Sequence, residues 1–250
     1  MCGRATLSTS PDELRQVFGL GETPTLTARY NIAPSQPIAV IRASAAPAAG
    51  ARRVELLRWG LVPSWAKDAK IGAKMINARV ESLTTRPAFR DALEHRRALV
   101  LVDGFYEWEK RGRARQPFFV HRADGRPFAL AGLWDRWTSP RGGDGVGVAR
   151  EVIESCAVVT CPAAPPCDRL HDRMPLVVPP PLWSLWLDAS IVDARRLEPA
   201  LRQSAASDEG LVLREVSTRV NRPDIDDATC IEPAAPEAPP APGLFDRYQR

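Results

Sequence analysis

The residue with the most distinctive chemistry is Cys2, which directly follows the initiator methionine. Removal of Met1 would give Cys2 a free α-amine and a thiol on adjacent carbons. The amine, with a pKa of about 7.7–8.0, is partly deprotonated near neutral pH and forms a Schiff base with an aldehyde. The thiol then adds to the imine carbon and closes a five-membered thiazolidine ring. The alternative is an ordinary thiol at a frayed chain end.

A second candidate group is the carboxylate of Glu107, which lies among aromatic residues. In a strand with a two-residue period, Phe105, Glu107 and Glu109 share one face, and Tyr106 and Trp108 share the other. A glutamate that faces inward has a raised pKa and suits general acid–base catalysis. If the same face is exposed, Glu107 is only a surface acid.

Asn77 and His171 are the remaining polar candidates. Asn77 is followed two residues later by Arg79, and His171 lies in a polar cluster between a proline-rich segment and an apolar one. Of the two other histidines, His95 falls in a basic helical segment and His121 in a strand. We expect these two to be structural or exposed.

The positive charge is concentrated in one part of the chain. The net charge is +4, but the acidic end from residue 224 carries six acids and two bases, which leaves +8 on residues 1–223. Residues 52–115 hold fifteen bases and eight acids, mixed with Trp59, Trp65, Phe89, Phe105, Tyr106 and Trp108. Such a mixture suits a nucleic-acid strand, because bases stack on aromatics and phosphates attract cations. Composition alone favours the simpler alternative, a solvated basic face over core aromatics.

The elements that must position these residues are mainly strands. Ser10-Pro11-Asp12-Glu13 is a capping box that predicts a helix to about Gly19. Further helices are expected over 86–96, with Thr84 or Thr85 as cap, and over 182–187 and 194–203. Strands are expected over 37–42, 53–58, 98–102, 105–110, 117–122, 127–134, 152–160 and 211–217. Asp124-Gly125 predicts a type I′ hairpin turn.

This pattern predicts a sheet-rich α+β fold, with a barrel as one form. We expect a single domain over residues 1–231 and a disordered Pro/Ala-rich tail over 232–250. The residues 43–51 read as a loop. The first ten residues lack the apolar core of a secretory signal, and no run of about 18 apolar residues occurs, so we expect a cytoplasmic protein. The five cysteines fit reduced thiols.

A set of short motifs, in order along the chain, resembles a known family. The motifs are Met-Cys-Gly-Arg at 1–4, Tyr-Asn-Ile-Ala-Pro-Ser-Gln at 30–36, Trp-Gly-Leu-Val-Pro-Ser-Trp-Ala at 59–66, Ile-Asn-Ala-Arg at 76–79, Gly-Phe-Tyr-Glu-Trp at 104–108, Ala-Gly-Leu-Trp at 131–134, His-Asp-Arg-Met-Pro at 171–175 and Val-Ser-Thr-Arg-Val-Asn at 216–221. Together they resemble the SRAP family, the SOS-response-associated peptidases or abasic-site processing proteins. The resemblance implies a β-barrel-like SRAP fold with short peripheral helices.

The resemblance also implies a covalent reaction with DNA. Cys2 looks like the nucleophile that forms a thiazolidine with the ring-opened abasic sugar. Glu107 resembles the family's catalytic carboxylate, His171 its histidine for ring opening or proton transfer, and Asn77 its asparagine near the reacting sugar or amine. The peptidase label implies self-removal of Met1. No cofactor and no metal are implied.

For DNA binding, Arg4, Arg79 and Arg173 match arginines expected to hold phosphates beside the lesion. Pro34 and Trp65 lie in loops that resemble those lining the strand path. The implied partner is single-stranded DNA with abasic sites, including single/double-strand junctions. A monomer is expected, cytoplasmic and nucleoid-associated when it is bound to DNA.

Three alternatives remain from the sequence. One is a single-strand-binding module in which Cys2 is a bystander. Another is an N-terminal-nucleophile amidohydrolase, which would use the same amine as base but whose other glutamine-site residues are missing. The third is a zinc module of Cys156, Cys161, Cys167 and His171, whose spacing does not match paired CxxC sites.

Overall fold

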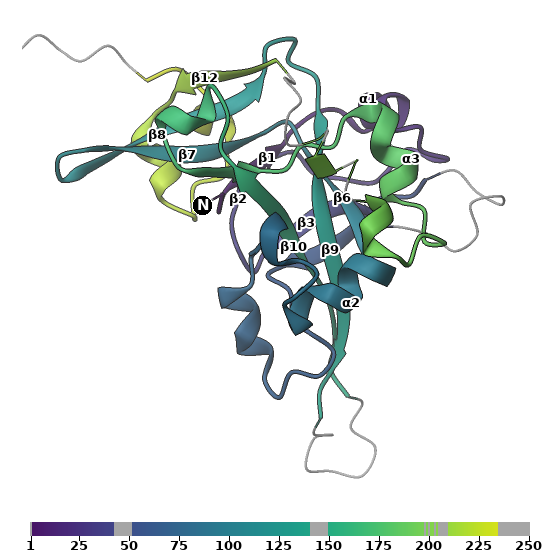
Figure 1. Ribbon diagram of the computed structural model, residues 1–250. Helices are drawn as coiled ribbons and strands as arrows, with labels where there is room; N and C mark the ends of the chain where they lie inside the picture. Colours follow the sequence, from purple (N-terminus) through teal and green to yellow (C-terminus); the bar gives the residue numbers. More distant parts are fainter. Residues whose placement is uncertain are drawn as a thin grey trace, which may run out of the picture.

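Two β-sheets and a few short helices make up the fold of the computed structural model (Figure 1). The structure describes residues 2–42, 52–140, 150–197, 199, 201–202, 204 and 210–234. The strands are β1 (Ala5–Leu7), β2 (Arg29–Ile32), β3 (Pro37–Arg42), β4 (Glu55–Trp59), β5 (Asn77–Arg79), β6 (Arg97–Val102), β7 (Gly104–Arg111), β8 (Ala114–Arg122), β9 (Phe128–Thr138), β10 (Val152–Pro162), β11 (Arg173–Pro175) and β12 (Leu211–Glu215).

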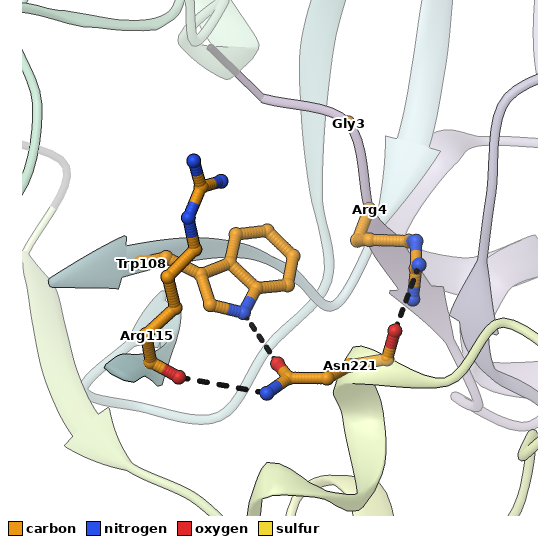
Figure 2. A pocket seen from close by; sticks show the side chains of 5 residues that line it. All are labelled: Gly3, Arg4, Trp108, Arg115 and Asn221. Carbon is orange, nitrogen blue, oxygen red and sulfur yellow. Dashed lines mark hydrogen bonds between the residues drawn. The ribbon is translucent and has the colours of Figure 1, made fainter. Parts of the chain in front are cut away.

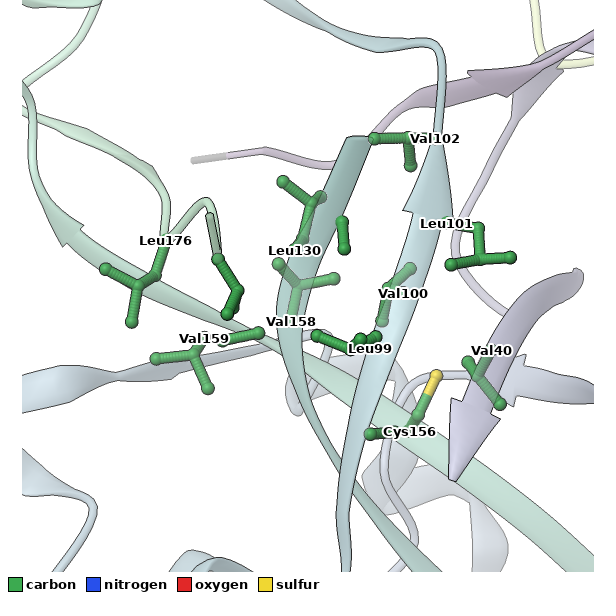
Figure 3. Packing of buried hydrophobic residues seen from close by; sticks show 14 of the residues in the cluster. Val40, Leu99, Val100, Leu101, Val102, Leu130, Cys156, Val158, Val159 and Leu176 are labelled. Carbon is green, nitrogen blue, oxygen red and sulfur yellow. The ribbon is translucent and has the colours of Figure 1, made fainter. Parts of the chain in front are cut away.

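The central unit is a closed barrel of five strands in the order β10-β4-β3-β6-β9, because β9 pairs back onto β10. The β10–β4 pairing is parallel, and the other four are antiparallel. Branched aliphatic side chains from these strands fill the barrel, as Figure 3 shows for Val40, Val100, Leu130 and Val158. The predicted sheet-rich, barrel-like α+β fold is confirmed. β5 and β11 extend the barrel along β10.

The second sheet has the order β12-β8-β7-β1-β2. The chain changes sheets between β6 and β7, at Asp103. Gly104 makes this crossing possible, since a Cβ there would lie 2.4 Å from the ring of Phe119 and 2.5 Å from the carbonyl oxygen of Val120. Only Asp103 separates β6 from β7, so Glu107 follows closely after the end of a buried barrel strand.

Helices cover the periphery. They are α1 (Pro11–Phe18), α2 (Pro87–His95) and α3 (Trp183–Trp186), with 3-10 helices η1 (Ala69–Lys74), η2 (Val80–Ser82), η3 (Cys167–Arg169), η4 (Pro180–Leu182), η5 (Ala194–Leu197), η6 (Thr218–Asn221) and η7 (Ala228–Cys230). Ser10 caps α1 as predicted. The expected cap of α2 at Thr84 or Thr85 is wrong, because Arg86 occupies that position without a side-chain hydrogen bond.

The predicted hairpin at Asp124-Gly125 is also wrong. β8 pairs with β7 and β12, whereas β9 pairs with β6 and β10, so the segment between β8 and β9 crosses from one sheet to the other. A type I′ turn needs positive φ at both central residues. Here Gly125 has φ +71°, and Asp124 is not in the positive region.

Three expectations fall on residues outside the described ranges. These are the loop at 43–51, most of the tail at 232–250 and part of the helix at 194–203, of which the structure has η5. The division into domains remains a prediction. Among the described helices, none combines the length and the apolar character that a membrane span requires.

Candidate functional site

The N-terminal strand carries Cys2 to the side of β7. β1 pairs antiparallel with β7, with Ala5 opposite Phe105, and the backbone N–H of Tyr106 donates to the carbonyl of Arg4 at 3.0 Å. If this pairing continues toward the N-terminus, Cys2 and Gly3 lie beside Trp108 and Glu107. Figure 1 accordingly shows the start of the chain beside β1 and β7.

The Asp103 carboxylate, at the crossing between the two sheets, anchors the N-terminal arm, residues 2–9. Asp103 accepts hydrogen bonds from the backbone N–H groups of Ser8 and Thr9 and from both of their hydroxyls. The residues just after β1 are therefore tied to the residue just before β7. This contact fixes the distance between the N-terminal arm and Glu107.

Cys2 is only 1% exposed and contacts Asn77 on β5. The Asn77 Nδ2 group donates to the Cys2 carbonyl oxygen at 2.8 Å. Its Oδ1 atom is buried and has no hydrogen-bond partner within the described part of the chain. An unsatisfied buried acceptor is costly. The Asn77 amide is thus held by Cys2 on one side and available to a donor on the other.

The surroundings of Cys2 disfavour ionisation of its thiol. Burial raises its pKa, and the nearby Glu107 carboxylate raises it further. The thiol is therefore protonated at neutral pH. Thiols react chiefly as thiolates, so any reaction here requires removal of its proton or prior attack by another nucleophile.

Glu107 faces the core, 3% exposed, and burial raises its pKa to about 7. Phe105, two residues earlier, packs in the barrel-side core, whereas Tyr106 and Trp108 belong to the cluster on the opposite face of β7. The predicted alternation along this strand is confirmed. A carboxyl group that titrates near pH 7 can both donate and accept a proton at physiological pH.

The loop between β10 and β11 supplies His171 and Cys167. Its base is closed by a hydrogen bond from the Ala163 N–H to the Asp172 carbonyl, 2.9 Å long. Burial lowers the pKa of His171. Nδ1 contacts both the Arg173 N–H, at 2.9 Å, and the Oδ1 atom of Asp172, at 2.7 Å. These contacts hold the ring in place, and its imidazole can take up or release a proton.

Two hollows meet at this place. The larger, about 660 Å³, is lined by Glu107, Trp108, Glu109, Lys110, Arg115, Arg169, Leu170 and His171. The smaller, about 400 Å³, is lined by Gly3, Arg4, Trp108, Arg115 and Asn221 (Figure 2). Both include Trp108 and Arg115, so these two side chains form the ridge between a hollow beside the Cys2 arm and a hollow beside the acid–base pair.

Val220 and Asn221, from the C-terminal part of the chain, contact both the N-terminal arm and Trp108. The Arg4 guanidinium donates to Asn31 Oδ1 and to the carbonyl of Val220, each at 2.7 Å. Trp108 Nε1 donates to Asn221 Oδ1 at 2.6 Å (Figure 2). Sequence reasoning quoted the motif that contains Asn221 but did not single it out, nor Asn31 or Arg115. Only the tertiary contact across more than a hundred residues reveals their role.

We expect Asn31→Ala to lower the free energy of unfolding by about 3 kcal/mol, because several buried polar groups lose their partner. Asn31 is fully buried, and its Nδ2 donates to the carbonyls of Val220, Arg222 and Ile225. Urea unfolding measures the change. Asn221→Ala, at an exposed position, is the control and should cost less than about 1 kcal/mol. Equal losses for both variants would contradict this role of Asn31.

The other predicted DNA-binding residues differ in accessibility. Arg79 is exposed at the end of β5. Arg173 makes a two-pronged ion pair with Glu81, at 2.5 and 2.9 Å. Pro34 is half-buried, and Trp65 is 59% exposed. Neither lines the two hollows. The structure thus brings together Cys2, Asn77, Glu107 and His171, with Arg4 beside them.

No set of three or more His, Cys, Asp or Glu side chains within the described residues is arranged to hold a metal ion. All five cysteines are buried free thiols. Cys156 lies on the barrel strand β10 and packs in its core. The zinc-module alternative therefore has no ligand set in this part of the chain.

Comparison with known proteins identifies the family. The family model described as SOS response associated peptidase (SRAP) matches residues 1–223. The chain belongs to the SRAP family. Its similarity to abasic site processing protein YoqW of Bacillus subtilis is 33% identity over 236 residues, 93% of this chain and 99% of the relative. YoaM of the same organism, also named an abasic site processing protein, is 33% identical over 239 residues, 93% of this chain and 98% of the relative.

The same fold occurs in a solved structure. A crystal structure of a protein from Bacteroides thetaiotaomicron matches with a TM-score of 0.77 and 20% identity, covering 94% of this chain and all of that one. At this identity the likeness concerns the fold. The sequence prediction of an SRAP member is confirmed.

Proposed function

We propose that this chain binds single-stranded DNA at abasic sites and forms a covalent adduct with them through Cys2. The observation that carries the proposal is the convergence of Cys2, Asn77 and Glu107 from three distant parts of the sequence. SRAP membership supports it, because relatives are named abasic site processing proteins. The role would be protection of abasic sites in the DNA damage response.

The reaction begins once Met1 has been removed. The α-amine of Cys2 attacks the aldehyde carbon C1′ of the ring-opened sugar, and loss of one water gives an imine. The thiol then adds to the same carbon, its proton passes to the imine nitrogen, and the thiazolidine ring closes. One water leaves in total, and no oxidant or cofactor is consumed. The amine attacks first in this scheme, which fits a thiol whose pKa is raised by burial.

Glu107 and His171 move the protons. Opening of the sugar ring and loss of water from the first adduct both need a proton delivered to an oxygen. Glu107, with a pKa of about 7, and the imidazole of His171 line the same hollow and are the groups that can deliver it. Asn77, through its free Oδ1, would hold the Cys2 amine or a sugar hydroxyl. Such positioning favours ring closure over release of the sugar.

The peptidase name of the family suggests how the amine is freed. We propose that Glu107 activates a water that hydrolyses the Met1–Cys2 peptide bond and releases methionine. The same carboxylate would then serve the DNA reaction. The protein would act as a monomer in the cytoplasm and associate with the nucleoid through DNA.

A denaturing gel tests this function. The protein without Met1 is incubated with three otherwise identical single strands, which carry an abasic site, its tetrahydrofuran analogue without an aldehyde, or an intact base. We expect a heat-stable shifted band with the abasic strand only. Binding to all three strands without any shifted band would instead indicate a non-covalent DNA-binding module. Absence of binding together with glutamine hydrolysis would indicate an amidohydrolase.

A further inference from the structure

Three cations surround the hollow that contains Glu107 and His171. Lys110 comes from β7, Arg115 from β8 and Arg169 from the 3-10 helix η3, and all three are exposed. Neither Lys110 nor Arg169 was a candidate from the sequence. Figure 2 shows the Arg115 side chain beside the indole of Trp108, with its guanidinium directed away from Asn221. The cations thus come from three separate elements to one concave surface.

None of these cations is held by an ion pair in the described part of the chain. The side chains of Lys110, Arg115 and Arg169 make no ion pair or hydrogen bond there, whereas Arg4 has three internal acceptors and Arg173 a two-pronged carboxylate. Breaking the internal contacts of Arg4 and Arg173 would reduce what either gains from a phosphate. Lys110, Arg115 and Arg169 have no such contacts to break when they bind a phosphate.

The register of the hairpin makes this arrangement unfavourable without an anion. Lys110 lies directly opposite Arg115 in the β7–β8 ladder. Like charges directly opposite each other on neighbouring strands are destabilising. The neighbouring acid Glu109 does not relieve the repulsion, since it pairs with Arg111 at 2.6 Å. An anion bound between Lys110 and Arg115 would relieve this repulsion.

We propose that Lys110, Arg115 and Arg169 form a phosphate-binding track for the DNA strand next to the abasic site. The inference rests on the proposed function and extends it, because it adds contacts to nucleotides on one side of the lesion. Glu107 and His171 line the same hollow as these three cations. A DNA strand whose abasic site lies at Glu107 therefore runs directly over the cations. Arginine and lysine so placed bind backbone phosphates of any sequence.

The test is the salt dependence of equilibrium binding to a strand that carries the tetrahydrofuran analogue, which cannot react. For Arg115→Gln/Arg169→Gln, we expect the slope of log K against log salt concentration to become shallower by about 1.4, since each phosphate contact on a single strand contributes about 0.7. The matched control is Arg15→Gln/Arg90→Gln, on α1 and α2, with the same loss of charge. The control should keep the wild-type slope.

Truncation of the strand provides a second readout. We expect wild-type affinity to fall when nucleotides are removed from one side of the lesion, and the Arg115/Arg169 double variant to be insensitive to that removal. An unchanged slope in this variant, or equal effects in both double variants, would overturn the track even if the wild type crosslinks normally. Failure of the wild type to crosslink abasic DNA, with the slope change intact, would instead refute the covalent function and leave the track standing.

Discussion

Cys2→Ala gives no heat-stable adduct with abasic single-stranded DNA at any time point, while it binds the tetrahydrofuran strand as tightly as the wild type. This is the largest effect we expect. The variant retains an N-terminal α-amine, and it can therefore form the imine, but it lacks the sulfur that closes the ring. The measurement is the time course of the shifted band on a denaturing gel.

Two controls separate the amine from the thiol. Trapping with cyanoborohydride should recover an adduct from Cys2→Ala, because the imine is reduced to a stable amine. A form with extra residues ahead of Cys2 keeps the thiol but has no free amine there, and it should give no adduct with or without the reductant. A stable adduct from this blocked form would show that the thiol alone reacts.

The second large effect is expected from Glu107→Gln. General acid–base catalysis contributes about 10²–10⁴-fold, so we expect the crosslinking rate at saturating DNA to fall by about 100-fold or more. The glutamine keeps the size of the side chain but does not titrate. The N-terminal mass is checked first, so that retained Met1 is not mistaken for a slow DNA reaction. An unchanged rate would remove Glu107 from the proton transfers.

The pH dependence supplies an independent check on Glu107. The wild-type rate should show an inflection near pH 7, from a carboxyl group whose pKa is raised by burial, in addition to that of the amine. Glu107→Gln should keep only the inflection of the amine. Because the folded protein holds the Glu107 proton more tightly than the unfolded chain does, wild-type stability falls as pH rises from about 4.5 to 7. The glutamine variant should lack this loss in urea unfolding.

Local patterns predicted the elements around the site well. The capping box predicted the start of α1 at Pro11, and the two-residue alternation put Glu107 on the same face of β7 as Phe105, while the fold shows that this face is buried. β3 occupies the predicted residues 37–42. These features depend on neighbours within a few residues, which a sequence displays directly.

Features set by distant contacts were not predictable in this way. The glycine at 125 signals a turn, but it carries no information about which sheet the next strand joins, and the hairpin prediction failed for that reason. Closure of the barrel depends on β9 meeting β10. The engagement of Arg4 by Asn31 and Val220 joins residues up to 216 positions apart. An arginine in a motif therefore looks free for phosphate until the fold supplies its partners.

Mass spectrometry of the purified adduct tests the central claim most directly. After denaturation, treatment with iodoacetamide and digestion of protein and DNA, the predicted product is a peptide that begins at Cys2 and carries the sugar residue with the loss of one water. Its sulfur should resist alkylation, because a thiazolidine has no free thiol. A sugar on a lysine, or an N-terminal peptide whose Cys2 is alkylated, would contradict a thiazolidine at Cys2.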